Sequence, residues 1–277
     1  MKIGKSQEMT VLEQQRQGYT LGDDGETTVF LPRDQASRAL EVGTGVQVFI
    51  FTDREGAPVA TMDTPKVEVE QFACLEVVDV TGHGTYLDWG LTRDLYLPFG
   101  LQQKHLRAGD RVVVGVGVDD YGRIYASSKL GEFFDYDTRS CEVKQEVDLL
   151  VYDFNDSGVQ VVIDGRYSGI LYYDQTFTNL RLGDTARGWI TFLRDDGRID
   201  VALQQPGRRG TDDAKAKIWA ALLAHDGFLA LTDKSSPTRI RGELQMSKKA
   251  FKKAIGALYK ERKITLGADG IRAVSST

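Results

Sequence analysis

The sequence contains few of the residues that disulfide frameworks, metal centres and membrane spans require. Only two of its 277 residues are cysteine and three are histidine, which excludes a disulfide framework and a zinc knuckle built from paired cysteines. Its apolar runs are shorter than the about 20 residues that cross a bilayer, and its first residues lack the apolar core of a secretory signal. We therefore expect a cytoplasmic protein with no membrane partner, in which Cys74 and Cys141 are free thiols.

Motifs of catalysis are also missing. The three histidines, His83, His105 and His225, belong to different predicted elements and lack the spacing of metal ligands. Gly82-His83-Gly84 lacks the third glycine of a dinucleotide-binding loop, and the sequence contains neither a complete Gly-x-x-x-x-Gly-Lys-Ser/Thr phosphate loop nor a Gly-x-Ser-x-Gly elbow. We predict a protein that is not an enzyme and that has no cofactor, no metal and no small-molecule substrate.

Net charge is distributed unevenly along the chain. The whole sequence carries −5, and residues 1–65, 66–137 and 138–206 carry −4, −5 and −4. Residues 207–277 instead carry +8, from 15 lysines and arginines against 7 aspartates and glutamates. Such a basic segment indicates polyanion binding, although a merely solvated surface explains it as well.

Four sequence marks recur in the same order three times, which indicates internal repeats. They are a glycine (Gly18, Gly84, Gly158), the residue fourteen positions later (Pro32, Pro98, Tyr172), the glycine of a Leu-x-x-Gly phrase (Gly43, Gly109, Gly183) and the glycine of an acidic turn (Gly56, Gly122, Gly197). The spacing predicts three domains, residues 1–65, 66–137 and 138–206, and leaves a fourth, residues 207–277.

The second repeat indicates that each unit is a small β-barrel. Its predicted strands are Phe72–Val80, Thr85–Trp89, Leu95–Leu97, Val112–Val118 and Ile124–Ser127. In the fourth of these, valines alternate with Val113, Gly115 and Gly117, which predicts one buried face and a glycine face that permits bending. Five short strands with a longer connection between the third and the fourth are typical of the OB-fold, a five-stranded Greek-key barrel.

Residues 207–277 change from a period of two to a helical period. The predicted elements are helices at 214–224, 237–244 and 247–262, a short strand at 228–231 and a hairpin at 264–274. Asp212 or Asp213 is expected to cap the first helix, Pro237 to open the second and Ser247 to cap the third. This order of elements is typical of a winged helix, a variant of the helix-turn-helix.

The third of these helices has an apolar side and a basic side. Phe251, Ile255 and Leu258 are expected to face the core. The candidate phosphate-binding lysines of this helix are Lys248, Lys249, Lys252, Lys253 and Lys260. Lysines at these spacings can reach phosphates and give a salt-sensitive affinity that depends little on base sequence; the competing interpretation is a solvated face.

The repeat marks resemble a known family of domains. Gly-x-aromatic, aromatic-Leu-Pro, Leu-x-x-Gly-Asp and Asp-x-x-Gly-Arg are similar to the S-one RNA-binding domain. The whole chain, with Gly84–Leu91 and Asp94–Phe99 as its most specific phrases, resembles the bacterial conserved virulence factor B family. The resemblance implies a mainly β protein with a C-terminal α+β domain, namely three tandem OB-fold barrels of the S-one type followed by a winged helix.

The resemblance also implies which residues contact RNA. In S-one domains these are aromatic residues on the second and third strands, a histidine on the third and basic residues near the fifth. Tyr86 and Tyr96 match the aromatic positions of the second unit, while Pro98 replaces the histidine. The further candidates are Trp89, Arg123 and Lys129 in the second unit and Tyr172 and Arg198 in the third. The competing interpretation is that Tyr86 and Tyr96 cap the barrel or pack against a neighbouring domain.

Incomplete aromatic sets suggest that some barrels are spacers. The first unit has Thr20, Phe30 and Pro32 at the positions in question.

We predict a noncatalytic protein that regulates gene expression by binding single-stranded RNA through its barrels and its basic winged helix, with DNA as an alternative ligand. Two other readings stay open: a DNA-binding transcription regulator that uses the winged helix, and a protein-interaction scaffold whose acidic barrels bind a basic partner.

Overall fold

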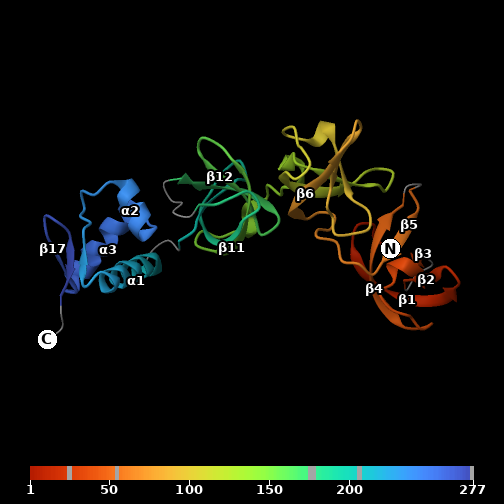
Figure 1. Ribbon diagram of the computed structural model, residues 1–277, viewed down its shortest axis with the longest axis horizontal. Coiled ribbons are helices and arrows are strands. Elements are labelled where there is room, and N and C mark those ends of the chain that lie inside the picture. The colour runs from red at the N-terminus through yellow and green to blue at the C-terminus, as the bar shows by residue number, and fades with distance from the viewer. Residues whose placement is uncertain (24–26, 54–55, 174–178, 205–207, 275–277) are drawn as a thin grey trace. The chain divides into compact units, whose positions relative to one another are not determined.

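The structure is a computed structural model that describes residues 1–277 except 24–26, 54–55, 174–178, 205–207 and 275–277 and the side chains of 208–210. The chain divides into two compact units, Met1–Phe134 and Asp135–Thr277. The first unit holds two barrels, and the second holds a third barrel and the helical C-terminal region (Figure 1).

The first barrel is a closed sheet of five strands. They are β1 (Ser6–Gln15), β2 (Gly18–Gly22), β3 (Thr28–Pro32), β4 (Gly45–Thr52) and β5 (Pro58–Thr61). Their order is β1-β2-β3-β5-β4, with β4 paired back to β1 and β3 running parallel to β5. This is the Greek-key topology expected of an OB-fold.

The second barrel repeats this order. Its strands are β6 (Phe72–Val80), β7 (Gly84–Leu87), β8 (Leu95–Pro98), β9 (Arg111–Val118) and β10 (Ile124–Ser127). The sheet runs β10-β9-β6-β7-β8, and β8 lies beside β10, although no ladder of hydrogen bonds joins these two described strands. The strands β6 and β10 have the predicted limits, because glycine and acidic turns interrupt the chain on both sides.

The third barrel is closed again. Its strands are β11 (Glu146–Phe154), β12 (Gly158–Ile163), β13 (Tyr167–Tyr172), β14 (Thr185–Leu193) and β15 (Ile199–Ala202). The order β11-β12-β13-β15-β14 and the parallel pairing of β13 with β15 match the first barrel. The prediction of three OB-type barrels is therefore confirmed.

The glycine face of β9 differs from the prediction. Val113 and Gly115 are buried, so this strand is covered on both faces rather than on one. A Cβ added at Gly115 would lie 2.8 Å from the ring of Phe133, and one at Gly117 would lie 2.8 Å from the ring of Tyr125. The glycines therefore make room for aromatic rings that cover the strand, one of them from the 3-10 helix Leu130–Phe133.

The C-terminal region has the element order of a winged helix. It consists of α1 (Arg208–Ala224), β16 (Phe228–Leu229), α2 (Pro237–Leu244), α3 (Lys248–Lys260), β17 (Ile264–Leu266) and β18 (Ile271–Ala273), with the sheet order β16-β18-β17. The hydroxyl of Ser247 accepts a hydrogen bond from the backbone N–H of Ala250 at 2.9 Å, as a cap should. The expected cap at Asp212 or Asp213 is wrong, because α1 already begins at Arg208 and both aspartates lie inside the helix.

The core of this region confirms the predicted apolar side of α3. Phe251, Ile255 and Leu258 are buried together with Ile218 and Leu222 of α1. The predicted domain boundary between residues 206 and 207 lies outside the described residues. No helix in the described part of the chain is long and apolar enough to span a bilayer.

Candidate nucleic-acid interface

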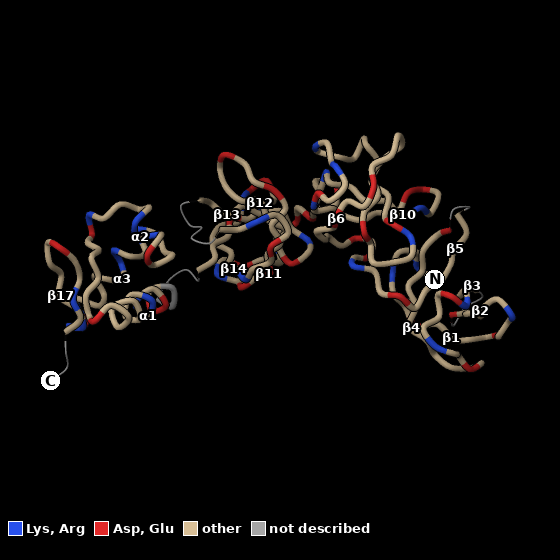
Figure 2. Tube along the Cα trace, in the orientation of Figure 1, with Lys and Arg blue, Asp and Glu red and all other residues tan. Residues whose placement is uncertain are grey.

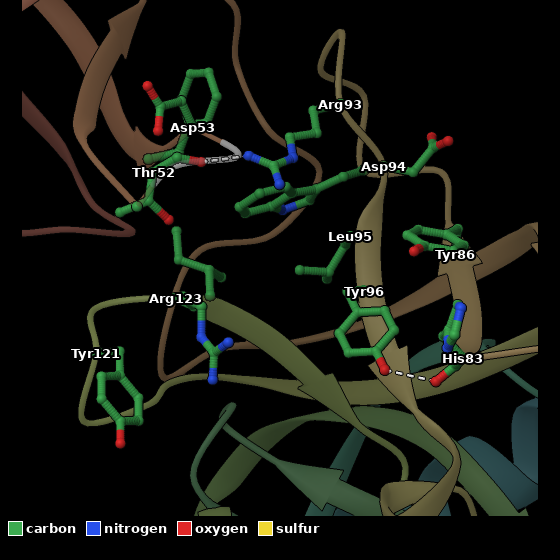
Figure 3. Close-up of a pocket in the computed structure, with 14 residues that line it drawn as sticks. Thr52, Asp53, His83, Tyr86, Arg93, Asp94, Leu95, Tyr96, Tyr121 and Arg123 are labelled. Atoms are coloured by element: carbon green, nitrogen blue, oxygen red, sulfur yellow. Dashed lines mark hydrogen bonds between the residues drawn. The ribbon is translucent and has the colours of Figure 1, made fainter.

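Tyr86 and Tyr96 form an aromatic pair on the surface of the second barrel. They lie opposite each other on β7 and β8, their ring centroids are 5.5 Å apart, and the ring planes are inclined by 46°. Both side chains are partly exposed. The hydroxyl of Tyr96 donates a hydrogen bond to the carbonyl oxygen of His83 at 2.7 Å, which holds this ring in place (Figure 3).

Gly84 explains how the Tyr96 ring can lie so close to β7. A Cβ at Gly84 would lie 2.3 Å from Cε2 of Tyr96, far inside van der Waals contact. The glycine that marks the start of the repeat therefore provides the space for the ring. The first barrel keeps the ring beside the glycine, since a Cβ at Gly18 would lie 2.8 Å from the ring of Phe30. It lacks the second ring, because Thr20 lies opposite Phe30.

Arg123 brings positive charge to the same face. Its guanidinium lies 5.2 Å from the ring centroid of Tyr121 and forms an ion pair with Asp119 at 2.7 Å. The side-chain hydrogen bond between them lowers the pKa of Asp119 and raises the pKa of Arg123. Tyr121 is 80% exposed and was missed in the sequence, although an aromatic residue in the acidic turn before Gly122 was a usable signal.

The tyrosine pair, Tyr121 and Arg123 line one cleft of about 800 Å³. Tyr86, Tyr96, Tyr121 and Arg123 line it from the second barrel, and Phe51–Asp53 line it from β4 and the residue that follows (Figure 3). Its volume is within the range of ordinary ligand-binding sites, about 300–1,000 Å³.

The cleft contains charges of both signs. Arg93 and Arg123 line it together with Asp53 and Asp94. Burial raises the pKa of the Asp94 carboxyl, and the negative charges of Asp88 and Asp79 raise it further. The two carboxylates therefore offset part of the positive charge that the two arginines bring to the cleft.

Trp89 does not belong to the exposed set. Its side chain is only 3% exposed and lies in the core shared by the first two barrels, although Trp89 is also one of the residues that line the cleft. Its ring meets Phe49 of β4 edge to face with centroids 5.4 Å apart, and its indole N–H donates to the carbonyl oxygen of Val67 at 2.7 Å. Packing between barrels, which a local pattern does not reveal, accounts for this residue.

Lys129 is exposed but lies apart from the aromatic pair. Its Nζ donates to the carbonyl oxygen of Gly100 at 2.7 Å, in the 3-10 helix after β8. It is not one of the residues that line the cleft.

The third barrel carries a polar cluster at the end of β13. Tyr172 receives a hydrogen bond from the guanidinium of Arg194, which is paired with Asp200 at 2.6 Å. Arg198 is paired with Asp196 at 2.5 Å. Arg194 and the 59% exposed Phe192 were missed in the sequence. Phe192 lies opposite Asp200 in the β14–β15 ladder, a neighbour that only the register reveals.

The lysines of α3 form a separate basic surface. Lys249, Lys252, Lys253 and Lys260 are exposed, as predicted. Figure 2 marks the positions of lysine and arginine along the described backbone in blue. Within the described residues none of these four has a carboxylate within 4.0 Å, whereas Lys215 and Lys263 are paired with Glu261. Lys248 is partly buried, and its Nζ lies 3.5 Å from the carbonyl oxygen of Lys234.

We found no group of three or more His, Cys, Asp or Glu side chains that could hold a metal ion among the residues that the structure describes.

Comparison with known proteins identifies the domain types. The S1 domain family model matches residues 3–63, and the model described as CvfB-like winged helix domain matches residues 216–272. Two of the similar proteins illustrate matches over most of the chain. The uncharacterized protein YitL of Bacillus subtilis is 28% identical over 95% of this chain and 91% of its own, and conserved virulence factor B of Staphylococcus aureus is 27% identical over 86% and 84%.

Over most of its length the chain is thus similar to conserved virulence factor B, and its C-terminal region matches the winged-helix model named for that family. A crystal structure of a multidomain protein with nucleic acid binding domains from Streptococcus pneumoniae is 23% identical, covers 98% of both chains and superposes with a TM-score of 0.43. The matched family models are an S1 domain and a winged helix, and the comparisons identify no catalytic domain.

Proposed function

We propose that this protein binds single-stranded RNA without catalysing a reaction, and that it regulates gene expression by doing so in the cytoplasm. The observation that carries the proposal is the Tyr86–Tyr96 pair, which lies partly exposed beside the exposed Arg123 on one face of an OB-type barrel. OB-folds bind single strands by stacking bases on such rings and by holding the phosphates with cations.

The geometry of the pair supports stacking on bases. Because the rings are inclined by 46°, they do not cover each other face to face, and each keeps surface for a base. Stacking contributes roughly 1–3 kcal/mol per base, so two rings are sufficient to make this barrel the main source of base contacts. The first and third barrels have no such pair at these positions, which favours an auxiliary or spacer role for these two barrels.

The winged helix would add affinity of a different kind. Lys249, Lys252, Lys253 and Lys260, which have no carboxylate within 4.0 Å among the described residues, can neutralise phosphates, which releases condensed counterions and makes binding salt-dependent. This contribution carries little sequence information. In this proposal domain 66–137 contacts bases and domain 207–277 contacts the backbone.

Competition between ligands of equal length tests the proposal. The full chain should bind single-stranded RNA more tightly than duplex DNA, and Tyr86→Ala combined with Tyr96→Ala should weaken RNA binding while the melting temperature stays near that of the unchanged protein. A folded double variant with unchanged RNA affinity would remove the second barrel from the interface.

The winged helix favours one alternative function. Since α3 presents lysines in the element that helix-turn-helix proteins insert into the major groove, a DNA-binding transcription regulator is the second candidate. It predicts that duplex DNA displaces RNA, and that the loss of Tyr86 and Tyr96 has no effect on duplex binding. Binding to neither nucleic acid would favour a protein-interaction scaffold.

A further inference from the structure

We propose that the first barrel forms one wall of the RNA-binding cleft of the second, and that Arg93 binds the phosphate backbone between them. This inference rests on the proposed function, and it gives the first barrel a direct role in binding although it lacks an aromatic pair of its own. The ligand is a single strand that continues from the Tyr86–Tyr96 pair toward the end of β4.

The two barrels are joined closely enough to form a common site. Phe49 and Phe51 of β4 belong to the same buried cluster as Trp89 and Leu95 of the second barrel. The N–H of Val69 donates to the carbonyl oxygen of Gly4 at 3.0 Å, which ties the connecting segment to the N-terminal strand region. Apolar packing and backbone hydrogen bonds thus hold the wall in a defined position within the first unit.

Arg93 lies where the two barrels meet. Its Nη1 donates to the carbonyl oxygen of Thr52 at 2.7 Å, a contact between residues 41 positions apart (Figure 3). A guanidinium has five N–H donors in a planar fork, so one bond to a carbonyl leaves donors for a ligand. The side chain is exposed and lines the cleft.

The charge of Arg93 is available to a ligand. In the described part of the chain no carboxylate lies within 4.0 Å of its guanidinium, whereas Arg123 in the same cleft is paired with Asp119. Arginine forms bidentate hydrogen bonds with phosphate. A strand that leaves the tyrosine pair and crosses the cleft toward the end of β4 would therefore meet Arg93 where it contacts Thr52.

Two substitutions at Arg93 separate phosphate binding from a purely structural role. The full chain would be titrated with labelled single-stranded RNA of about 12 nucleotides, within the range of strands that OB-folds bind, at several salt concentrations. We expect Arg93→Gln to weaken binding and to lower the slope of log affinity against log salt by about 0.7, the value for one phosphate contact on a single strand. Arg93→Lys should keep the slope of the unchanged protein, because it keeps the charge.

Arg107→Gln is the matched control. Arg107 is an exposed arginine of the same barrel that does not line the cleft, and its replacement should leave the slope unchanged. Thermal melting of each variant checks that the first unit remains folded.

The outcomes distinguish this inference from the proposed function. If Arg93→Gln weakens binding without changing the salt slope, Arg93 only ties the barrels together and the inference is overturned. If the double tyrosine variant weakens binding but Arg93→Gln behaves like Arg107→Gln, the composite cleft is wrong and the proposed function stands. If neither the tyrosines nor Arg93 matters, both fail together.

Discussion

The lysines of α3 allow a quantitative test of how the winged helix binds RNA. The perturbation is the replacement of Lys249, Lys252 and Lys253 by glutamine. All three are exposed, and none has a carboxylate partner among the residues that the structure describes. Glutamine keeps most of the side-chain length and has a helix propensity close to that of lysine. The change therefore removes three charges while the buried face of Phe251 and Ile255 stays intact.

The expected magnitude follows from counterion release. Each phosphate contact on a single strand contributes about 0.7 to the salt slope, so three contacts contribute about 2.1. Between 50 and 200 mM salt, a fourfold change, the unchanged protein should lose about 18-fold more affinity than the triple variant, as this slope difference requires. The free energy of unfolding should change by less than about 0.5 kcal/mol, because exposed residues away from caps contribute little.

Fluorescence anisotropy with labelled RNA at several salt concentrations measures the slope. The control is a triple variant with Arg38, Arg107 and Arg111 replaced by glutamine, which are exposed arginines of the first unit outside the cleft. Both triple variants have a formal net charge of −8, three below the −5 of the unchanged chain, so only the position of the removed charges differs. If the α3 variant and the unchanged protein have the same salt slope, the three lysines do not contact phosphates. If both triple variants lower the slope equally, the effect comes from net charge and not from the position of the lysines.

Three further predictions concern single sites. Trp89→Ala should lower the free energy of unfolding of the first unit by about 3–5 kcal/mol, measured by denaturant titration, because it empties the core between the two barrels; a loss below about 1 kcal/mol would contradict this packing role. Gly84→Ala should weaken RNA binding by displacing the Tyr96 ring, which a Cβ would approach to 2.3 Å, and unchanged affinity would show that the position of this ring does not matter. Hydrogen bonds from Arg272 lower the pKa of Asp269 from 3.8 to about 2, so this pair stabilises the hairpin of the winged helix above about pH 4 and ceases to do so as the pH falls through about 2. Carboxyl chemical shifts during an acid titration should show this midpoint, which Arg272→Gln should return toward 3.8; the same midpoint in both proteins would disprove the pairing.

The local order of the chain was determined by the sequence alone. Glycines at turns, strict alternation and the threefold repeat predicted the strands, because these signals act over a few residues and depend on backbone conformation. The opposition of Tyr86 and Tyr96 was predictable for the same reason, since the repeat marks define the register of β7 and β8. The exposed lysines of α3 followed from the helical period, which assigns each side chain to a face.

Contacts between distant parts of the chain were decided by the tertiary structure. Trp89 looked like a member of an exposed aromatic set, but Phe49 from the preceding barrel covers it, and nothing near it in the sequence indicates this. The glycine face of β9 is likewise closed by Phe133, a ring 18 positions beyond Gly115. Arg93 became a candidate only when its hydrogen bond to Thr52 placed it in the cleft. Burial and charge pairing depend on which segments contact each other in the folded protein. Local periodicity carries no information about contacts between segments that are distant in the sequence.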